Sequence, residues 1–165
     1  MLDQDVRAYI VKLDHTAIAV RRVRDALPLY RDLLGGKLHS AGDMPHQGFR
    51  WVQLVYPGGS KIELLEPLSD DGFLARFLDK YGEGAHHMTF KVQRIEELVQ
   101  VLRARGYRVV DEKYDDPHWK EAFISPRSAH GIIVQVAESD LTDADERRFW
   151  SFDTLAEKVL GDGKA

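Results

Sequence analysis

The chain has 165 residues, 44% of them hydrophobic, which suffices for a core in one domain or in two small fused modules. A formal net charge of −4 and a pI near 6.0 exclude a basic stripe, so nucleic acid or an anionic membrane is not expected as the main partner. Cysteine is absent, which removes disulfides, zinc–thiolate sites and thiol nucleophiles. Any metal must be bound by histidine nitrogen and by oxygen. With no apolar run of about 18 residues, we expect a cytoplasmic protein.

The first part of the chain has a strand, a helix and three further strands. Residues 13–20 alternate as a strand does and place His15 on one face. Apolar residues then recur at helical spacing over 23–34, although Pro28 fits the interior of a helix poorly. Three more strands are predicted at 37–43, 49–56 and 61–66. This βαβββ order defines a first module at 10–67.

The pattern restarts after a linker helix within 68–84. The second module, 85–139, has a strand at 85–92 and a helix at 95–105. Its remaining strands are predicted at 107–113, 120–125 and 131–137. The tail, 140–165, reads as a helix that packs on the body or on a second subunit.

The two modules repeat each other at an offset of 72 positions. His15 falls on His87, and Glu63 falls on Gln135. Self-similarity at a fixed offset indicates a duplicated structural unit. The sequence therefore predicts an α+β protein of two fused βαβββ modules, whose curved mixed sheets enclose a metal site, with an additional C-terminal helix.

Four residues at this offset are the candidate metal ligands: His15, Glu63, His87 and Gln135. A single histidine in a strand is more often a hydrogen-bonded core residue than a ligand, but two histidines and two Glu/Gln at one offset favour a ligand set. Imidazole nitrogen with carboxylate or amide oxygen suits a divalent first-row metal, so Co, Zn, Ni, Mn or Fe is expected.

The other histidines have different expected roles. His86 alternates onto the apolar face of its strand and is expected to be structural. His46 and His118 lie in polar loops, where they are either second acid/base groups or solvent-exposed residues. His39 and His130 are expected at the surface.

The motifs together resemble the vicinal oxygen chelate superfamily of glyoxalase, bleomycin resistance and extradiol dioxygenase proteins, and within it the methylmalonyl-CoA epimerase family. The resemblance covers about 12–138 and leaves out the tail. The motifs that carry it are Asp14-His15-Thr16-Ala17-Ile18-Ala19-Val20, Ala26-Leu27-Pro28-Leu29-Tyr30-Arg31-Asp32-Leu33-Leu34-Gly35, Ile62-Glu63-Leu64-Leu65-Glu66-Pro67, Gly82-Glu83-Gly84-Ala85-His86-His87 and Phe123-Ile124-Ser125-Pro126-Arg127-Ser128.

This resemblance implies a glyoxalase-type fold and places His15, Glu63, His87 and Gln135 at the four metal positions of the family. The family commonly has Glu where Gln135 stands, and that Glu is thought to serve as ligand and as proton-transfer base. An amide cannot take a proton at physiological pH, so Glu63 is the first candidate for the base. The resemblance also implies a small-molecule substrate of the acyl-CoA type and a homodimer.

The leading function is a metal-dependent enzyme that stabilises an enolate during proton transfer next to a carbonyl, as an epimerase does, with His46 or His118 as the second acid/base. A glyoxalase I-type lyase belongs to the same chemical class. A second reading is a non-haem iron extradiol-type dioxygenase that uses His15, His87 and Glu63. The third is a binding or resistance protein without catalysis.

Overall fold

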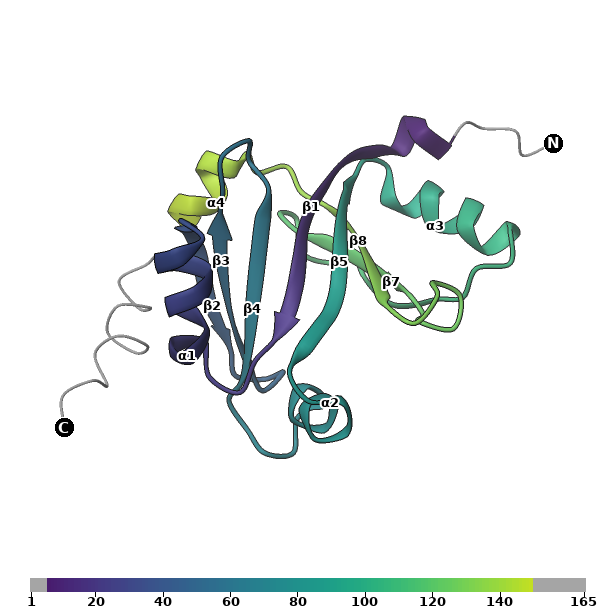
Figure 1. Ribbon diagram of the computed structural model, residues 1–165. Coiled ribbons are helices and arrows are strands. Elements are labelled where there is room, and N and C mark those ends of the chain that lie inside the picture. The colour runs from purple at the N-terminus through teal and green to yellow at the C-terminus, as the bar shows by residue number, and fades with distance from the viewer. Residues whose placement is uncertain (1–5, 150–165) are drawn as a thin grey trace. The chain divides into compact units, whose positions relative to one another are not determined.

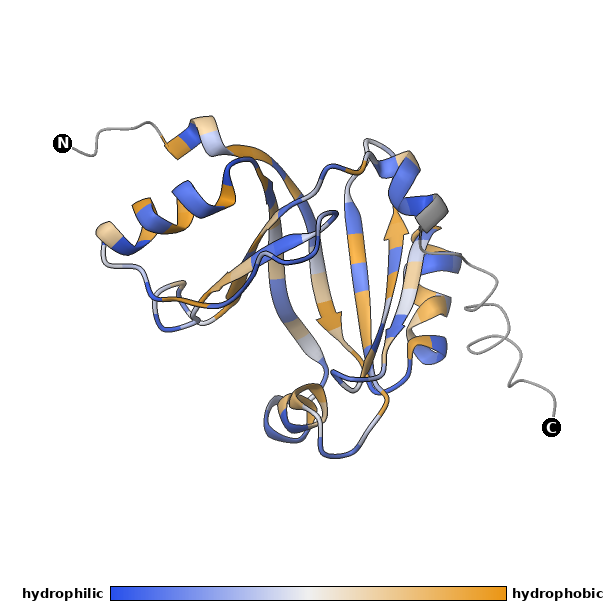
Figure 2. Ribbon diagram, turned by 180° about the vertical axis from the view of Figure 1, so that it is seen from behind, coloured by the Kyte–Doolittle hydropathy of each residue, from blue (hydrophilic) through white to orange (hydrophobic). Residues whose placement is uncertain are grey.

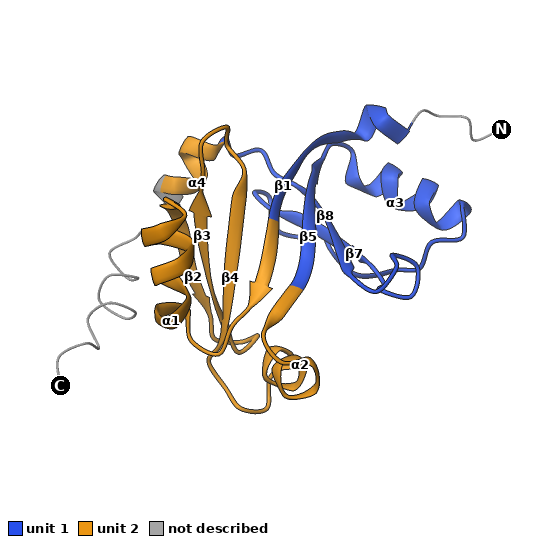
Figure 3. Cartoon of the chain, in the orientation of Figure 1, with its two compact units in different colours: residues 1–15, 86–142 blue, residues 16–85, 143–165 orange. Residues whose placement is uncertain are grey.

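The computed structural model describes residues 6–149 and divides the chain into two compact units (Figure 3). Unit 1 consists of 1–15 and 86–142, and unit 2 of 16–85 and 143–165. Within 6–149, no helix has the length and apolar character needed to cross a membrane. The modules predicted at 10–67 and 85–139 are defined by sequence repetition and stay a prediction.

Unit 2 is built on an antiparallel sheet with strand order β2-β3-β4 (Figure 1). The last residues of β1 (Ile10–Ala19) also belong to it. Its other elements are α1 (Val23–Leu27), the π-helical turn η2 (Pro28–Leu33), β2 (Lys37–Met44), β3 (Phe49–Val55), β4 (Lys61–Pro67), α2 (Phe73–Tyr81) and α4 (Asp143–Phe149).

Pro28 interrupts the helix that the sequence predicts over 23–34. The α-helix ends at Leu27, and the chain continues as a π-helical turn in which the Leu34 amide donates to the Leu29 carbonyl at 3.0 Å. Proline has no N–H, and its ring crowds the preceding turn, so an unbroken α-helix is disfavoured here.

Unit 1 contains a mixed sheet with strand order β5-β8-β7-β6, in which the pair β5 and β8 is parallel and the other pairs are antiparallel. The first residues of β1 belong to this unit. Its other elements are the short 3-10 helix η1 (Val6–Tyr9), β5 (Gly84–Val92), α3 (Ile95–Ala104), β6 (Val109–Lys113), β7 (Lys120–Ile124) and β8 (Ile133–Glu138). Helix α3 carries alternating apolar and polar residues, as an amphipathic helix does (Figure 2).

The hydrophobic cores of the two units use equivalent residues. In unit 2 the helix α1 packs on its sheet, and in unit 1 the helix α3 does so. The buried residues at the 72-residue offset are Val20, Val23, Leu27 and Leu64 in unit 2 and Val92, Ile95, Val99 and Val136 in unit 1. The sequence repeat therefore corresponds to a repeat in packing.

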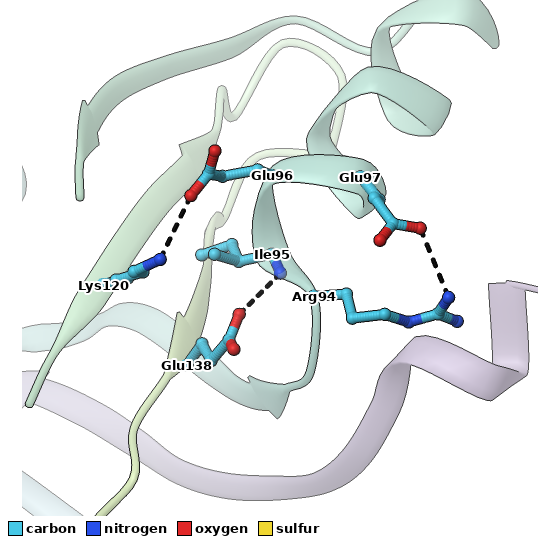
Figure 4. A pocket seen from close by; sticks show the side chains of 6 residues that line it. All are labelled: Arg94, Ile95, Glu96, Glu97, Lys120 and Glu138. Atoms are coloured by element: carbon cyan, nitrogen blue, oxygen red, sulfur yellow. Dashed lines mark hydrogen bonds and ion pairs between the residues drawn. The ribbon is translucent and has the colours of Figure 1, made fainter. Parts of the chain in front are cut away.

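A glutamate from the last strand of each repeat caps the helix of the same repeat in the same manner. The Val23 amide donates to Glu66 Oε2 at 2.5 Å, and the Ile95 amide donates to Glu138 Oε2 at 2.7 Å (Figure 4). The first amides of a helix have no partner within the helix, and a carboxylate also suits the positive end of its dipole. Each glutamate thus ties a helix to its sheet.

The α+β class and most elements agree with the sequence pattern. The helix of the linker segment is α2, and the helix predicted at 95–105 is α3. Of the predicted helical tail, α4 lies among the described residues, and 150–165 lie outside them.

The prediction that His39 lies at the surface is wrong. His39 is 1% exposed, whereas His130 is exposed as predicted. The pairing of β2 with β3 shifts between Leu38 and Ser40, so His39 is the extra residue of a β-bulge. A bulge breaks the alternation of side chains and turns one of them to the other face.

Candidate metal centre

His15 and His87 lie together in unit 1. They are 3% and 8% exposed, and their ring centroids lie 5.7 Å apart in an edge-on arrangement. Burial lowers the pKa of His87 well below its ordinary value, and the neighbouring rings of His15 and His86 lower it further. A neutral imidazole is the form that binds a metal.

Two buried neighbours fix the ring of His15. Its Nδ1 lies 2.8 Å from Asp14 Oδ2, and its Nε2 lies 2.9 Å from the hydroxyl oxygen of Thr89. The Asp14 carboxylate accepts from Nδ1–H, so Nε2 is the nitrogen that a metal ion would take, in place of its contact with the Thr89 hydroxyl. Metal-bound histidines in proteins typically donate their second ring nitrogen to such a carboxylate.

His86 holds the ring of His87. The Nδ1 atoms of the two rings lie 3.0 Å apart, and the rings are nearly perpendicular. One Nδ1 must donate and the other accept. If His87 donates, its Nε2 keeps a lone pair for a ligand. Burial lowers the pKa of His86 to about 4, so both rings are neutral at neutral pH.

Gln135 lies on β8 and is held at both ends of its amide. Its Oε1 accepts from the Thr89 hydroxyl at 2.5 Å, and its Nε2 donates to Glu121 Oε2 at 2.7 Å. Glu121 is itself fixed by Trp119 Nε1 at 2.9 Å and by Lys113 Nζ at 3.0 Å. Thr89 therefore connects Gln135 with His15.

Glu63 lies on β4 in unit 2 and is 8% exposed. Its Oε2 accepts from Gln53 Nε2 at 2.8 Å, and Gln53 stands directly opposite it on β3. Gln53 Oε1 accepts from the Ser40 hydroxyl at 3.4 Å. The carboxylate is therefore oriented by a buried hydrogen-bond chain of its own unit.

The two loop histidines are at the surface of their units. His46 is exposed in the turn between β2 and β3. The side chain of His118 is 42% exposed, and its Nδ1 lies 3.0 Å from Asp140 Oδ1. Neither has the buried surroundings of His15 and His87.

The sequence pattern did not single out Asp14, Thr89 and Glu121. Thr89 shares a strand face with His87, and Glu121 precedes by two positions Phe123, the residue opposite Gln135 on the neighbouring strand. The register of β7 on β8 is the signal that would have found Glu121. Asp14 points toward His15 although it is the adjacent residue, which alternation does not predict.

Unit 1 offers the buried imidazole nitrogens of His15 and His87, and unit 2 offers the buried carboxylate of Glu63. Two neutral nitrogens and one carboxylate are a donor set for a divalent first-row ion. The carboxylate of Asp14 behind His15 fits the surroundings of a metal-bound histidine. The residues present therefore suit such an ion.

Known proteins similar to this chain include epimerases. The chain is 33% identical over 129 residues to the uncharacterized protein YqjC of Bacillus subtilis strain 168, covering 77% of this chain and 91% of that protein. It is 32% identical over 131 residues to the mitochondrial methylmalonyl-CoA epimerase of Homo sapiens, covering 78% and 74%. A crystal structure of methylmalonyl-CoA epimerase from Mycobacterium tuberculosis matches with a TM-score of 0.74 at 29% identity, covering 85% of this chain and 95% of that one.

The match to a protein family agrees with these likenesses. Residues 14–123 match the Glyoxalase/Bleomycin resistance protein/Dioxygenase superfamily, a range that includes His15, Glu63 and His87. The α+β fold, with its short helices, is of the glyoxalase type. The chain belongs to the Glyoxalase/Bleomycin resistance protein/Dioxygenase superfamily.

Proposed function

We propose that the protein is a divalent-metal-dependent enzyme that moves a proton on the carbon next to a thioester carbonyl, with an acyl-CoA of the methylmalonyl type as substrate. The names of similar proteins support the substrate class, since the human and mycobacterial relatives are methylmalonyl-CoA epimerases. The family supports the metal, since its metal positions correspond to His15, Glu63 and His87.

The observation that carries the proposal is the fixed ring of His15 beside His87. Asp14 holds Nδ1, Thr89 contacts Nε2, and the ring of His87 lies 5.7 Å away. A core histidine also needs a hydrogen-bond acceptor, but a carboxylate on the second ring nitrogen is the partner that metal-bound histidines typically have. This arrangement presents nitrogen lone pairs at a fixed place, as a ligand set must.

In the proposed enzyme, His15, Glu63 and His87 hold the metal, and Gln135 contributes its amide oxygen as the fourth ligand. The metal supplies a positive charge that stabilises the substrate oxygen as the adjacent carbon loses its proton. Thr89 and Glu121 act as positioning residues, because they hold the amide of Gln135 at its two ends.

Proton transfer needs a group other than Gln135, because its amide cannot accept a proton. Glu63 is the proposed proton acceptor, and Gln53 orients it through Oε2. Epimerisation also requires a group that returns the proton to the opposite face of the carbon. His46 or His118 is proposed for that role, since both are accessible histidines.

The test compares metal content and substrate exchange in matched variants. We expect the wild type to bind Co²⁺ at the site of His15 and His87 and to incorporate solvent deuterium into methylmalonyl-CoA. We expect His15→Ala and His87→Ala to lose the ion of this site and the exchange. The exposed His130→Asn is the control and should keep both. Exchange that stays at the uncatalysed rate in Co²⁺-loaded wild type would exclude the proposed reaction.

One observation favours a second candidate, an iron-dependent extradiol-type dioxygenase. The amide of Gln135 is neutral, so Glu63 is the one charged donor among the four candidates. Two histidines with one carboxylate are the ligand set of many non-haem iron oxygenases. The superfamily name also includes dioxygenases. Oxygen uptake by anaerobically iron-loaded protein after addition of catechols would favour this candidate, whereas stoichiometric ligand binding without turnover would favour a binding protein.

A further inference from the structure

A second group of potential ligands lies in unit 2, where α4 contacts β2. One ring nitrogen of His39 and one carboxylate oxygen each of Asp143 and Glu146 lie within 4.8 Å of one another. His39 and Glu146 are 1% and 2% exposed, whereas the side chain of Asp143 is 54% exposed. The group is therefore buried but can be reached from solvent on one side.

The hydrogen bonds of His39 show which nitrogen is available. The Ser40 hydroxyl donates its only proton to Gln53 Oε1, because Gln53 Nε2 is engaged by Glu63. Ser40 Oγ must then accept from His39 Nδ1, 3.0 Å away. His39 is thus protonated on Nδ1, and its Nε2 carries a lone pair.

This lone pair is buried and has no hydrogen-bond partner among residues 6–149. An unsatisfied buried acceptor is unfavourable, so its persistence calls for a partner beyond residues 6–149. Burial lowers the pKa of His39 and Lys61 lowers it further, while the carboxylates of Glu146 and Asp143 act in the opposite direction. The β-bulge at His39 is what turns the ring inward.

Lys61 shows that the group already attracts a cation. Its ammonium lies 3.6 Å from Asp143 Oδ1 and 3.6 Å from Glu146 Oε2, and its side chain is 1% exposed. Both distances exceed those of a direct charged hydrogen bond. The Lys61 ammonium therefore forms ion pairs with both carboxylates at a longer distance than a direct hydrogen bond.

We propose that His39 Nε2, Asp143 and Glu146 form a second divalent-cation site, which takes a borderline transition ion such as Zn²⁺ or Co²⁺ and fastens α4 to β2. One imidazole nitrogen and two carboxylate oxygens are common ligands of these ions, and water completes the shell. The Lys61 ammonium competes with the ion, so the site binds more weakly than it would without that charge.

An ion bound to His39 also affects Glu63, because a chain of hydrogen bonds connects the two residues. From His39 the chain runs through Ser40 and Gln53 to Glu63 Oε2. An ion on His39 Nε2 fixes the Nδ1–H tautomer, and with it the direction of every hydrogen bond in the chain. The second site therefore holds the orientation of the Glu63 carboxylate.

The experiment separates the two sites by their ligands. In a His15→Ala/His87→Ala variant, equilibrium dialysis against Co²⁺ with visible absorption spectra should show about one ion per chain. Adding Asp143→Asn, at a side chain that is 54% exposed, should weaken this binding about tenfold or more, since a direct ligand matters at least as much as the outer partners of a metal. Asp145→Asn on the same helix is the matched control and should leave the affinity unchanged.

The other possible results of this experiment also decide whether the second site exists. A His15→Ala/His87→Ala variant that binds no Co²⁺, or equal affinities in the Asp143→Asn and Asp145→Asn variants, overturns the second site. If the double variant does not fold, Asp143→Asn in the wild-type background must lower the bound Co²⁺ from two ions to one. If the proposed catalytic site is wrong but the second site exists, the wild type binds one ion and Asp143→Asn weakens it.

Lys61 and α4 provide two further readouts. Lys61→Met should tighten Co²⁺ binding by about tenfold, because a competing charge is removed. Zn²⁺ should slow tryptic cleavage after the exposed Arg147 in α4 and should do so less in Asp143→Asn. Unchanged affinity in Lys61→Met together with metal-independent cleavage would contradict the proposal.

Discussion

At the scale of single residues, the positions of Asp14 and Thr89 decide what His15 can do. Both are buried, and they contact the two ring nitrogens of one imidazole. The carboxylate fixes the tautomer, and the hydroxyl connects the ring to Gln135. The ring therefore cannot turn without breaking contacts on both sides.

Asp14→Asn tests this arrangement. The amide removes the charge behind His15 and stabilises the Nδ1 proton less well, so we expect Co²⁺ affinity to fall roughly 10- to 100-fold. Competition with a coloured chelator measures the affinity. Asp25→Asn, at an exposed position in α1, should leave it unchanged. Equal affinities in the two variants would show that Asp14 has no part in metal binding.

Gln135→Glu tests the contact with Glu121. A second carboxylate would face Glu121 Oε2, 2.7 Å from the present amide nitrogen, so we expect a loss of about 1 to 3 kcal/mol in the free energy of unfolding. Gln135→Glu/Glu121→Gln restores an amide–carboxylate pair and should recover most of the loss in urea denaturation. A double variant no more stable than the sum of the two single changes would contradict the pairing.

The candidate ligands His15, Glu63, His87 and Gln135 could be selected from the sequence, but their hydrogen-bonding neighbours could not. His15 and His87 stand at one offset and Glu63 and Gln135 at the same offset, which a comparison of the chain with itself shows. Glu121 contacts Gln135 across two strands, so finding it requires the strand register.

At the scale of elements, the glutamate caps show how the repeated units are built. Glu66 binds the first amide of α1, and Glu138 binds that of α3. The two helices are thereby fixed on strands that also carry Glu63 and Gln135. In each unit, one hydrogen bond thus joins the helix that packs on the sheet to the strand that carries a candidate ligand.

Glu138→Ala tests the cap of α3. The Ile95 amide would lose its acceptor, and we expect the free energy of unfolding to fall by about 1 kcal/mol, as with other helix N-caps. Glu97→Ala, whose exposed carboxylate pairs with Arg94, should cost less than about 0.5 kcal/mol. Thermal unfolding followed by circular dichroism compares them, and equal losses would show that the cap is unimportant.

Periodicity predicted the strands and α3 because their apolar faces are regular. It failed at His39, because a β-bulge adds one residue to β2 and reverses the alternation beyond it. At Pro28, which fits the interior of a helix poorly, the predicted helix is divided into an α-helix and a π-helical turn. The bulge depends on the pairing of β2 with β3, which a single-sequence pattern does not contain.

At the scale of the whole molecule, the buried histidines make stability depend on pH. Burial lowers the pKa of His86 from 6.5 to about 4 and lowers that of His87 in the same direction. As the pH falls below 6.5, these two histidines become protonated in the unfolded chain but stay neutral in the folded protein. Protonation therefore favours the unfolded chain. The stabilisation is complete above pH 6.5 and is lost as the pH falls toward 4.

Urea denaturation of metal-free protein between pH 7 and pH 4.5 measures this effect. For His86 alone, a shift of this size amounts to roughly 3 kcal/mol by pH 4. His86→Gln removes the titrating group and should flatten the dependence over this range. The same slope in His86→Gln and wild type would show that His86 is not buried as a neutral ring.

The central claim is metal-dependent proton exchange by this chain. The most direct measurement is the incorporation of solvent deuterium into methylmalonyl-CoA, followed by mass spectrometry, with metal-free protein, Co²⁺-loaded protein and Co²⁺-treated His15→Ala. Exchange above the uncatalysed rate only in the Co²⁺-loaded wild type is the predicted result. Exchange that is equal in all three samples, or absent from all three, would contradict it.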